Sequence, residues 1–187
     1  MKKVTSGRQL RFWQSKFRMS LDYIFGKGTS KKLDFSDLTL LVSSRTGRLR
    51  QIVHKDSREV LFSFRPNGSI APTVSGAQYL LEWSSKGSTR RKKSESAKKT
   101  RPRWVVTVID GVSEFVSQGK TVFCRHVAYC DDSLRANEDV VVLNEKGELL
   151  AVGKSVIAGP LMKQFKRGAA VKVREGASQR TNGPDEL

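Results

Sequence analysis

Residues 147–176, GELLAVGKSVIAGPLMKQFKRGAAVKVREG, decide the fold of the C-terminal part of this chain. Apolar residues alternate with polar or small ones at both ends of the stretch, which predicts two β-strands around a short helix, PLMKQF. Pro160 fits the first turn of that helix, and Gly168 is expected to end it. The stretch is also basic throughout, because between Ala151 and Arg174 it carries six basic residues and no acid.

The residues just before this basic strip have the opposite charge. From Asp131 to Glu148 the sequence carries six acids, against only Arg135 and Lys146 as bases. A domain that is acidic in one half and basic in the other can dock one face onto a phosphate backbone. A nonspecific binder would gain little from that polarity.

Short strands and one more short helix are expected in the rest of this part. WVVTVI (104–109), KTVFCRHVAYC (120–130) and DVVVLN (139–144) read as strands, and GVSEFVSQ (111–118) reads as a helix. Asp110 is expected to cap that helix and Gly119 to end it. Asn137 suits a left-handed turn, and the segment Glu145-Lys146-Gly147 predicts a hairpin. About five or six strands and two short helices predict a small closed or half-closed barrel.

The N-terminal part predicts a separate α+β domain over residues 1–83. Its first helix shows an apolar stripe and is expected to end at Gly26 and Gly28. Three β segments follow, at 38–44, 48–54 and 58–64, and then a closing helix over 74–83. The stripe consists of Leu10, Trp13, Phe17, Leu21 and Ile24.

Charge is distributed unevenly along the 187 residues, whose formal net charge is +17. Residues 1–83 have a net charge of +9, and residues 104–187 are neutral in sum. Residues 84–103 hold nine bases and one acid, and their composition predicts a flexible linker. Residues 177–187 are expected to be a disordered tail. The net charge of +17 favours a polyanionic partner, with nucleic acid ahead of an anionic membrane.

Several other classes are excluded by the sequence. It contains no apolar run of about 18 residues and no apolar segment typical of a signal peptide, so a cytoplasmic protein is expected. Cys124 and Cys130 share one face of the predicted 120–130 strand, about 20 Å apart, which forbids a disulfide there. Buried thiols are expected instead, and no metal ion or cofactor is predicted.

The C-terminal residues 104–176 resemble a PUA domain, an RNA-binding module. The resemblance rests on FVSQGKTVFCRHV (115–127), VVVLNEKGELLAVGKS (140–155) and MKQFKRGAAVKVREG (162–176). One departure is Ala136-Asn137, where the family often has Pro-Gly. LDYIFGKGTSKKL (21–33), SSRTGRLRQI (43–52) and LFSFRPNGSIAPTVSGAQYLL (61–81) resemble the domain that precedes PUA in archaeal tRNA-guanine transglycosylases.

The resemblance implies an RNA-binding chain, with tRNA as the first choice of ligand. It places RNA on the loop after the first helix of the PUA domain and on the final strand, Val171 to Arg174. Glycine in that loop would let backbone N–H groups approach phosphates. In the final strand Lys172 and Arg174 share one face, while Val171 and Val173 face the core. The predicted RNA-binding residues are Gly119, Lys120, Thr121, Arg125, Lys154, Lys166, Arg167, Lys172 and Arg174.

Other interpretations of the same residues stay open. Lys172 and Arg174 could be the ordinary exposed face of a strand. Arg125 and His126 are expected on opposite faces of the 120–130 strand, with His126 structural rather than catalytic. The tryptophans could stack on bases, although Trp13 is expected in the core, Trp104 at the start of a strand at the domain junction, and Trp83 half-buried.

A noncatalytic tRNA-binding chain is the main hypothesis, and one form of it is an accessory chain to a separate tRNA-modifying enzyme. The transglycosylases carry out their chemistry in a (β/α)₈ barrel of about 250 residues, for which this sequence has no room. A ribosome-associated or translation-factor RNA binder remains an alternative. A small RNA-modifying enzyme is the other, with Asp110, Asp131 and Asp132 as its suggestive carboxylates.

Overall fold

The computed structural model describes residues 1–4, 7–85 and 102–180 and divides the chain into two compact units, Met1–Arg91 and Lys92–Leu187. The division falls within the segment 84–103, most of which lies outside the described residues, as do residues 181–187. Among the helices that the structure describes, none is both long and apolar enough to cross a membrane.

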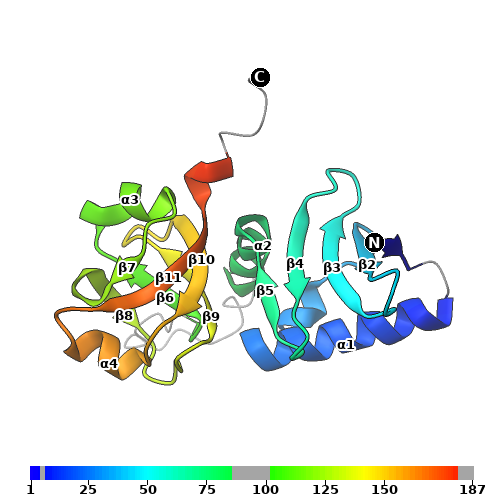
Figure 1. Ribbon diagram of the computed structural model, residues 1–187, viewed down its shortest axis with the longest axis horizontal. Helices are drawn as coiled ribbons and strands as arrows, with labels where there is room; N and C mark the ends of the chain where they lie inside the picture. The colour runs from blue at the N-terminus through cyan, green and yellow to red at the C-terminus, as the bar shows by residue number, and fades with distance from the viewer. Residues whose placement is uncertain (5–6, 86–101, 181–187) are drawn as a thin grey trace. The chain divides into compact units, whose positions relative to one another are not determined.

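The N-terminal unit is an antiparallel sheet with two helices (Figure 1). Its five strands lie in sequence order, β1-β2-β3-β4-β5, and the first helix carries the predicted apolar stripe. The sequence predicted both helices and the three longer strands, but it missed β1 and β5, which are too short to show an alternating pattern. The elements are β1 (Lys2–Lys3), α1 (Gly7–Phe25), η1 (Thr29–Lys32), β2 (Leu38–Val42), β3 (Leu49–His54), β4 (Val60–Phe64), β5 (Ile70–Pro72) and α2 (Val74–Ser85).

Aromatic packing joins α1 to this sheet. Phe17 is fully buried, and its ring centroid lies 5.4 Å from that of Phe62 and 5.7 Å from that of Phe64. Leu21 and Phe25 complete the buried face of the helix. Trp13, expected in the core, is only half-buried. The stripe therefore buries its C-terminal half and leaves its first turns nearer the surface.

The C-terminal unit is a nearly closed, barrel-like sheet of six strands (Figure 1). The strand order is β7-β11-β10-β9-β6-β8, with antiparallel neighbours except for the parallel pair β6 and β9. Its core is formed by buried aliphatic side chains and both cysteines. The elements are β6 (Val105–Val108), η3 (Asp110–Val112), α3 (Ser113–Ser117), β7 (Val122–Phe123), η4 (Cys124–His126), β8 (Val127–Cys130), β9 (Asp139–Leu143), β10 (Leu149–Ser155), α4 (Gly159–Gln164), β11 (Ala169–Gly176) and η5 (Ala177–Arg180).

The predicted turns of this unit are confirmed. Gly147 has a φ of 89° in the β9–β10 hairpin, where the Asn144 amide donates to the Glu148 carbonyl at 3.1 Å. Asn137 has a φ of 66°. Pro160 lies in the first turn of α4.

The predicted strand 120–130 is wrong, because the 3₁₀ helix η4 interrupts it and separates β7 from β8. Cys124 lies in η4 and Cys130 ends β8, so the expected strand spacing between them does not apply. Both thiols are free and buried, as predicted, and burial raises the pKa of each. A single strand was the simplest interpretation because a one-turn 3₁₀ helix leaves little trace in the apolar alternation.

Two helix boundaries also differ from the expectation. Asp110 caps no helix: it lies inside η3, and its Oδ1 accepts a hydrogen bond from the backbone amide of Glu145 at 3.2 Å. Helix α4 ends before Gly168, because Phe165 already has an extended backbone. At the C-terminal end, residues 177–180, which were expected to begin a disordered tail, form η5.

Candidate nucleic-acid interface

The loop after α3 closes a helix end through its own backbone. The Gly119 amide donates to the Val116 carbonyl at 2.9 Å, and the Lys120 amide donates to the Phe115 carbonyl at 3.1 Å. This pair of bonds, with Gly119 at a φ of 87°, is a Schellman motif. Both N–H groups therefore already donate to backbone carbonyls, and a contact of this loop with phosphate stays a prediction. The exposed side chains of Lys120 and Thr121 remain as the outward groups of the loop.

Gly119 has a second role in packing. A Cβ at this position would lie 2.6 Å from Nε2 of Gln179. That amide nitrogen donates to the Gln118 carbonyl at 3.1 Å, and Oε1 of the same side chain accepts from the Gly176 amide at 3.1 Å. Residues of η5 thus hold the end of α3 against the end of β11. Local sequence patterns do not reveal this anchoring, because it depends on residues about sixty positions apart.

The structure brings the loop and the last strand together, as predicted. In the β7–β11 pair, Val122 lies opposite Val171. Thr121 directly precedes this pair and Lys172 directly follows it. On β11, Lys172 and Arg174 are exposed, while Val173 packs against the core. The predicted alternation of this strand is confirmed.

Two lysines face each other on neighbouring strands. Lys154 of β10 and Lys172 of β11 are direct partners in the antiparallel register, and Asp139 of β9 is the next partner in the same row. Side chains at directly opposed positions lie on one face, and like charges placed so are unfavourable. Neither lysine forms an ion pair within the described part of the chain. A bound anion would relieve this repulsion.

Two cations of the basic strip are neutralised by the acidic segment. Nη1 of Arg174 lies 2.8 Å from Oδ1 of Asp139, whose side chain is 5% exposed. Nζ of Lys163 lies 2.7 Å from Oδ1 of Asp132, and this hydrogen bond raises the pKa of Lys163. The acidic and basic halves of the sequence therefore interleave in space. The cations without such a partner among the described residues are Lys154, Lys166, Arg167 and Lys172.

A second basic group lies at the other end of β7. Ala169 is the register partner of Phe123, and the Cys124 amide donates to the Gly168 carbonyl at 3.0 Å. These contacts place the exposed Lys166 and Arg167, which precede Gly168, near η4 with its exposed Arg125.

Arg125 and His126 are on the same side rather than on opposite faces. Nε of Arg125 donates to Nε2 of His126 at 2.9 Å, which is possible because both lie in η4 and not in a strand. Burial, with a smaller effect of the Arg125 charge, lowers the pKa of His126. The neutral imidazole thus acts as an acceptor that orients Arg125.

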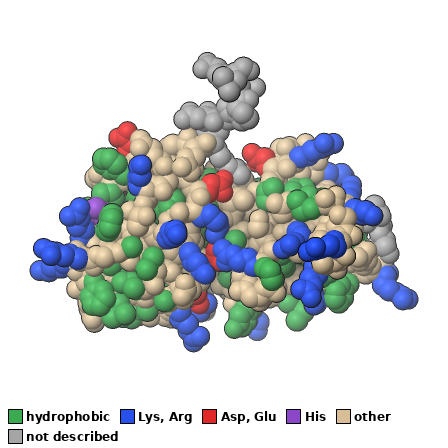
Figure 2. Space-filling model, viewed as in Figure 1, with side chains coloured by type: hydrophobic (Ala, Val, Ile, Leu, Met, Phe, Trp, Pro, Cys, Tyr) green, Lys and Arg blue, Asp and Glu red, His purple; other side chains and the backbone are tan. Residues whose placement is uncertain are grey.

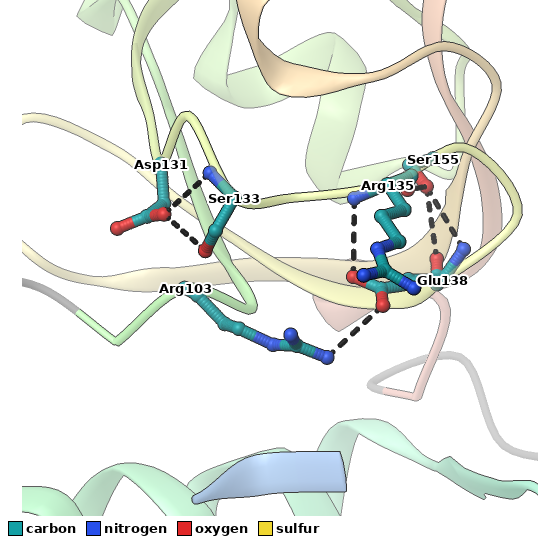
Figure 3. Close-up of polar contacts among 6 residues, drawn as sticks. All are labelled: Arg103, Asp131, Ser133, Arg135, Glu138 and Ser155. Carbon is teal, nitrogen blue, oxygen red and sulfur yellow. Dashed lines mark hydrogen bonds and ion pairs between the residues drawn. The ribbon is translucent and has the colours of Figure 1, made fainter.

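Glu138 and Ser155 form a network of hydrogen bonds with Arg103 and Arg135 (Figure 3). Oε1 of Glu138 accepts from Arg103 at 3.0 Å, and Oε2 accepts from the Arg135 amide at 3.2 Å. The Ser155 hydroxyl donates to the Arg135 carbonyl at 2.7 Å and accepts from the Glu138 amide at 3.0 Å. This network holds the 135–138 turn against the end of β10.

The carboxylates considered for an enzyme have structural partners. Oδ1 of Asp131 accepts from the Ser133 amide at 2.8 Å and from its hydroxyl, which lowers the pKa of this carboxyl (Figure 3). Asp132 binds Lys163, and Asp110 binds a backbone amide. Within residues 1–4, 7–85 and 102–180, no group of three or more His, Cys, Asp or Glu side chains could hold a metal ion.

Exposed aromatic rings near the basic groups were missed by the sequence analysis. Phe115, Phe123 and Phe165 are 60%, 44% and 49% exposed. Phe165 directly precedes Lys166 and Arg167 in the sequence, and Phe123, two positions before Arg125, is the register partner of Ala169. The sequence feature that could have indicated them is an aromatic residue next to basic residues, as in Phe165-Lys166-Arg167. On the face visible in Figure 2, Lys and Arg side chains are spread over both units, whereas Asp and Glu are sparse.

Residues 104–177, which form the barrel-like C-terminal unit, match the PUA domain family. Residues 15–86 match the patch-forming domain C2 of tRNA-guanine transglycosylase. The chain therefore carries the two domains that resemble the C-terminal pair of the archaeal tRNA-guanine(15) transglycosylases.

Curated relatives extend both matches. The chain is 34% identical over 162 residues to the tRNA-guanine(15) transglycosylase of Methanocaldococcus jannaschii, covering 86% of this chain and 22% of the relative. It is 32% identical over 174 residues to that of Thermoplasma acidophilum, covering 92% of this chain and 25% of the relative. The chain thus spans about a quarter or less of the length of these relatives.

Solved structures share the fold. A hypothetical protein from Pyrococcus horikoshii OT3 superposes with a TM-score of 0.65 at 24% identity, covering 94% of this chain and 93% of that one. A conserved PUA domain protein from Thermoplasma acidophilum gives a TM-score of 0.50 at 19% identity, covering 98% of this chain and 94% of that one.

Proposed function

We propose that this chain binds RNA, tRNA in the first place, through the PUA-domain surface along β11, and that it does so without catalysing a reaction. The observation that carries the proposal is the direct opposition of Lys154 and Lys172 beside the exposed Lys120 and Thr121. Three separate segments contribute these side chains. Neither Lys154 nor Lys172 has an ion-pair partner among the described residues, which suits this array to a phosphate backbone.

The group at η4 extends the same proposed surface. Arg125, Lys166 and Arg167 supply further charge, and Phe123 offers an exposed ring that could stack on an unpaired base. Arg174 has a different role from the one expected, because its guanidinium is held by Asp139. We assign it to ordering the surface and not to carrying a free charge.

The test compares a tRNA transcript with duplex DNA of equal length at several salt concentrations. We expect tighter binding of the tRNA, with an affinity that falls steeply with salt, because phosphate contacts release counterions. Equal affinities for the tRNA and the duplex DNA at physiological salt would mean that binding reflects only the overall positive charge of the chain. Cross-linking in cells and sequencing of the bound RNA would separate tRNA from a ribosomal target.

An accessory role in tRNA modification is a second candidate. It is favoured by the match of both units to a region that makes up only 22% of the M. jannaschii transglycosylase. A chain that holds tRNA for a separate catalyst would raise the effective concentration of the substrate. The test is gentle purification of the tagged full chain and an assay for guanine exchange into tRNA. Co-purifying exchange activity supports the role, whereas a monomer with bound tRNA and no enzyme contradicts it.

A further inference from the structure

A groove of about 650 Å³ opens on the N-terminal unit. Its wall is formed by one side of α1, by the start of β3 and by the β2–β3 and β4–β5 turns. The volume lies within the roughly 300–1,000 Å³ range of small-ligand sites. The lining residues are Trp13, Lys16, Met19, Ser20, Thr46, Arg48, Leu49, Arg50, Phe64, Arg65, Pro66 and Gly68.

The charges of this groove have one sign. Lys16, Arg48, Arg50 and Arg65 are among its lining residues, and no Asp or Glu is. Arg48 and Arg50 are exposed and sit two positions apart, on either side of the buried Leu49. Cations gathered around one hollow repel each other, and an anion placed among them would be attracted by all of them. The groove therefore attracts a negatively charged group.

Aromatic rings stand next to these cations. Nζ of Lys16 lies 5.0 Å from the ring centroid of Phe12 and 5.7 Å from that of Trp13, and the two rings pack edge to face at 5.0 Å. Phe12 is 50% exposed, and Phe64 forms part of the groove wall. Interleaved aromatic and basic side chains are the arrangement that binds bases by stacking and phosphates by charge.

An unsatisfied donor marks the same wall. Nε1 of Trp13 is buried and has no hydrogen-bond partner among the described residues. A buried donor without an acceptor is unfavourable, and native structures contain few of them. A ligand that reorients the indole and offers an acceptor would remove this penalty.

We propose that this groove binds an unpaired nucleotide of a single-stranded RNA segment, with its base against Trp13 and its phosphate between Arg48, Arg50 and Lys16. The inference rests on the proposed RNA binding for the choice of ligand. It assigns a second, separate contact on the other unit, and one with a preference for unpaired nucleotides. An acidic peptide would use the charges but would leave the aromatic wall without a stacking partner.

The experiment measures binding of a labelled five-nucleotide single-stranded RNA and of a tRNA transcript to the full chain by fluorescence anisotropy. The groove variant is Arg48→Gln/Arg50→Gln. The matched control is Lys31→Gln/Lys55→Gln, which removes two exposed charges of the same unit outside the groove. We expect the groove variant, and separately Trp13→Leu, to lose about tenfold in affinity for the short RNA. The control variant and Trp13→Phe should lose less than about threefold.

The readouts separate this inference from the proposed function. If the chain binds tRNA but not the short RNA, or if the groove and control variants weaken the short RNA equally, the groove inference is wrong and the PUA proposal stands. If the chain binds neither RNA, both fail. Binding of an acidic peptide that is lost in Arg48→Gln/Arg50→Gln but not in Trp13→Leu would also overturn it. Circular dichroism of each variant confirms that it is folded.

Discussion

Arg174 on β11 reaches across β10 to Asp139 on β9, with 2.8 Å between Nη1 and Oδ1. The Asp139 side chain is 5% exposed, while the Arg174 side chain is 37% exposed. Asp139 is therefore part of the barrel interior, whereas Arg174 lies at its surface. A loss of RNA binding on substitution of Arg174 would not by itself show a phosphate contact.

Substitution of Arg174 is expected to destabilise the PUA domain. Arg174→Gln leaves the Asp139 carboxylate buried without its cation, which should lower the free energy of unfolding by about 1–3 kcal/mol. Lys172→Gln, two positions away on the same strand face, should change it by less than about 0.5 kcal/mol. Urea unfolding measures both. Asp139→Asn in the Arg174→Gln background should recover part of the lost free energy of unfolding, because it removes the carboxylate charge that Arg174 no longer balances. If the effects of the two substitutions simply add, the two residues are not coupled.

The lysine pair is expected to govern salt-dependent RNA binding. Lys154→Gln and Lys172→Gln should each lower the magnitude of the slope of log affinity against log salt by about 0.7–0.9, because each removes one phosphate contact. Lys172→Gln should not reduce stability, since it removes a like-charge opposition. Lys146→Gln, in the exposed β9–β10 turn, is the control that removes the same charge. An equal change of slope in the control would show that the docking surface is wrongly placed.

Gly119 is expected to be a stability residue. Gly119→Ala should lower the free energy of unfolding by about 1–2 kcal/mol, because alanine at positive φ is strained. Gly111→Ala is the matched control, since a Cβ there meets nothing within 4 Å and its φ is not positive. Thermal unfolding measures both. If Gly119→Ala keeps its stability but loses RNA binding, the result would support a direct contact of this loop with phosphate instead.

Stability is expected to depend on pH through His126. Its pKa in the folded chain is lowered from 6.5, so the unfolded chain binds the proton more readily. The stabilising effect is therefore fully present above pH 6.5 and is lost as the pH falls through the folded pKa. Unfolding measured between pH 7.5 and 5.5 should show this loss in the wild-type chain, and His126→Gln should flatten it. An unchanged profile in the variant would assign the loss to another group.

Local sequence pattern determined most of the secondary structure and the identity of the C-terminal fold. The stripe on α1, the alternation of Lys172 and Arg174 and the left-handed turns at Asn137 and Gly147 depend on residues a few positions apart. Such features survive in the sequence because the backbone conformation of each is set by its nearest neighbours. The break at Cys124–His126 was missed, because a 3₁₀ helix of three residues is too short to produce a periodic pattern of its own.

Only the tertiary structure decided which charges remain available. Arg174 and Asp139 lie 35 positions apart and meet because β9, β10 and β11 are neighbours in the sheet. The strip from Lys154 to Arg174 looked uniformly basic, but two of its six cations are paired with acids. The groove on the N-terminal unit likewise combines Trp13, Arg48 and Arg65 from separate segments. Composition records the number of charges and rings, whereas their partners depend on strand order and register, which no local pattern encodes.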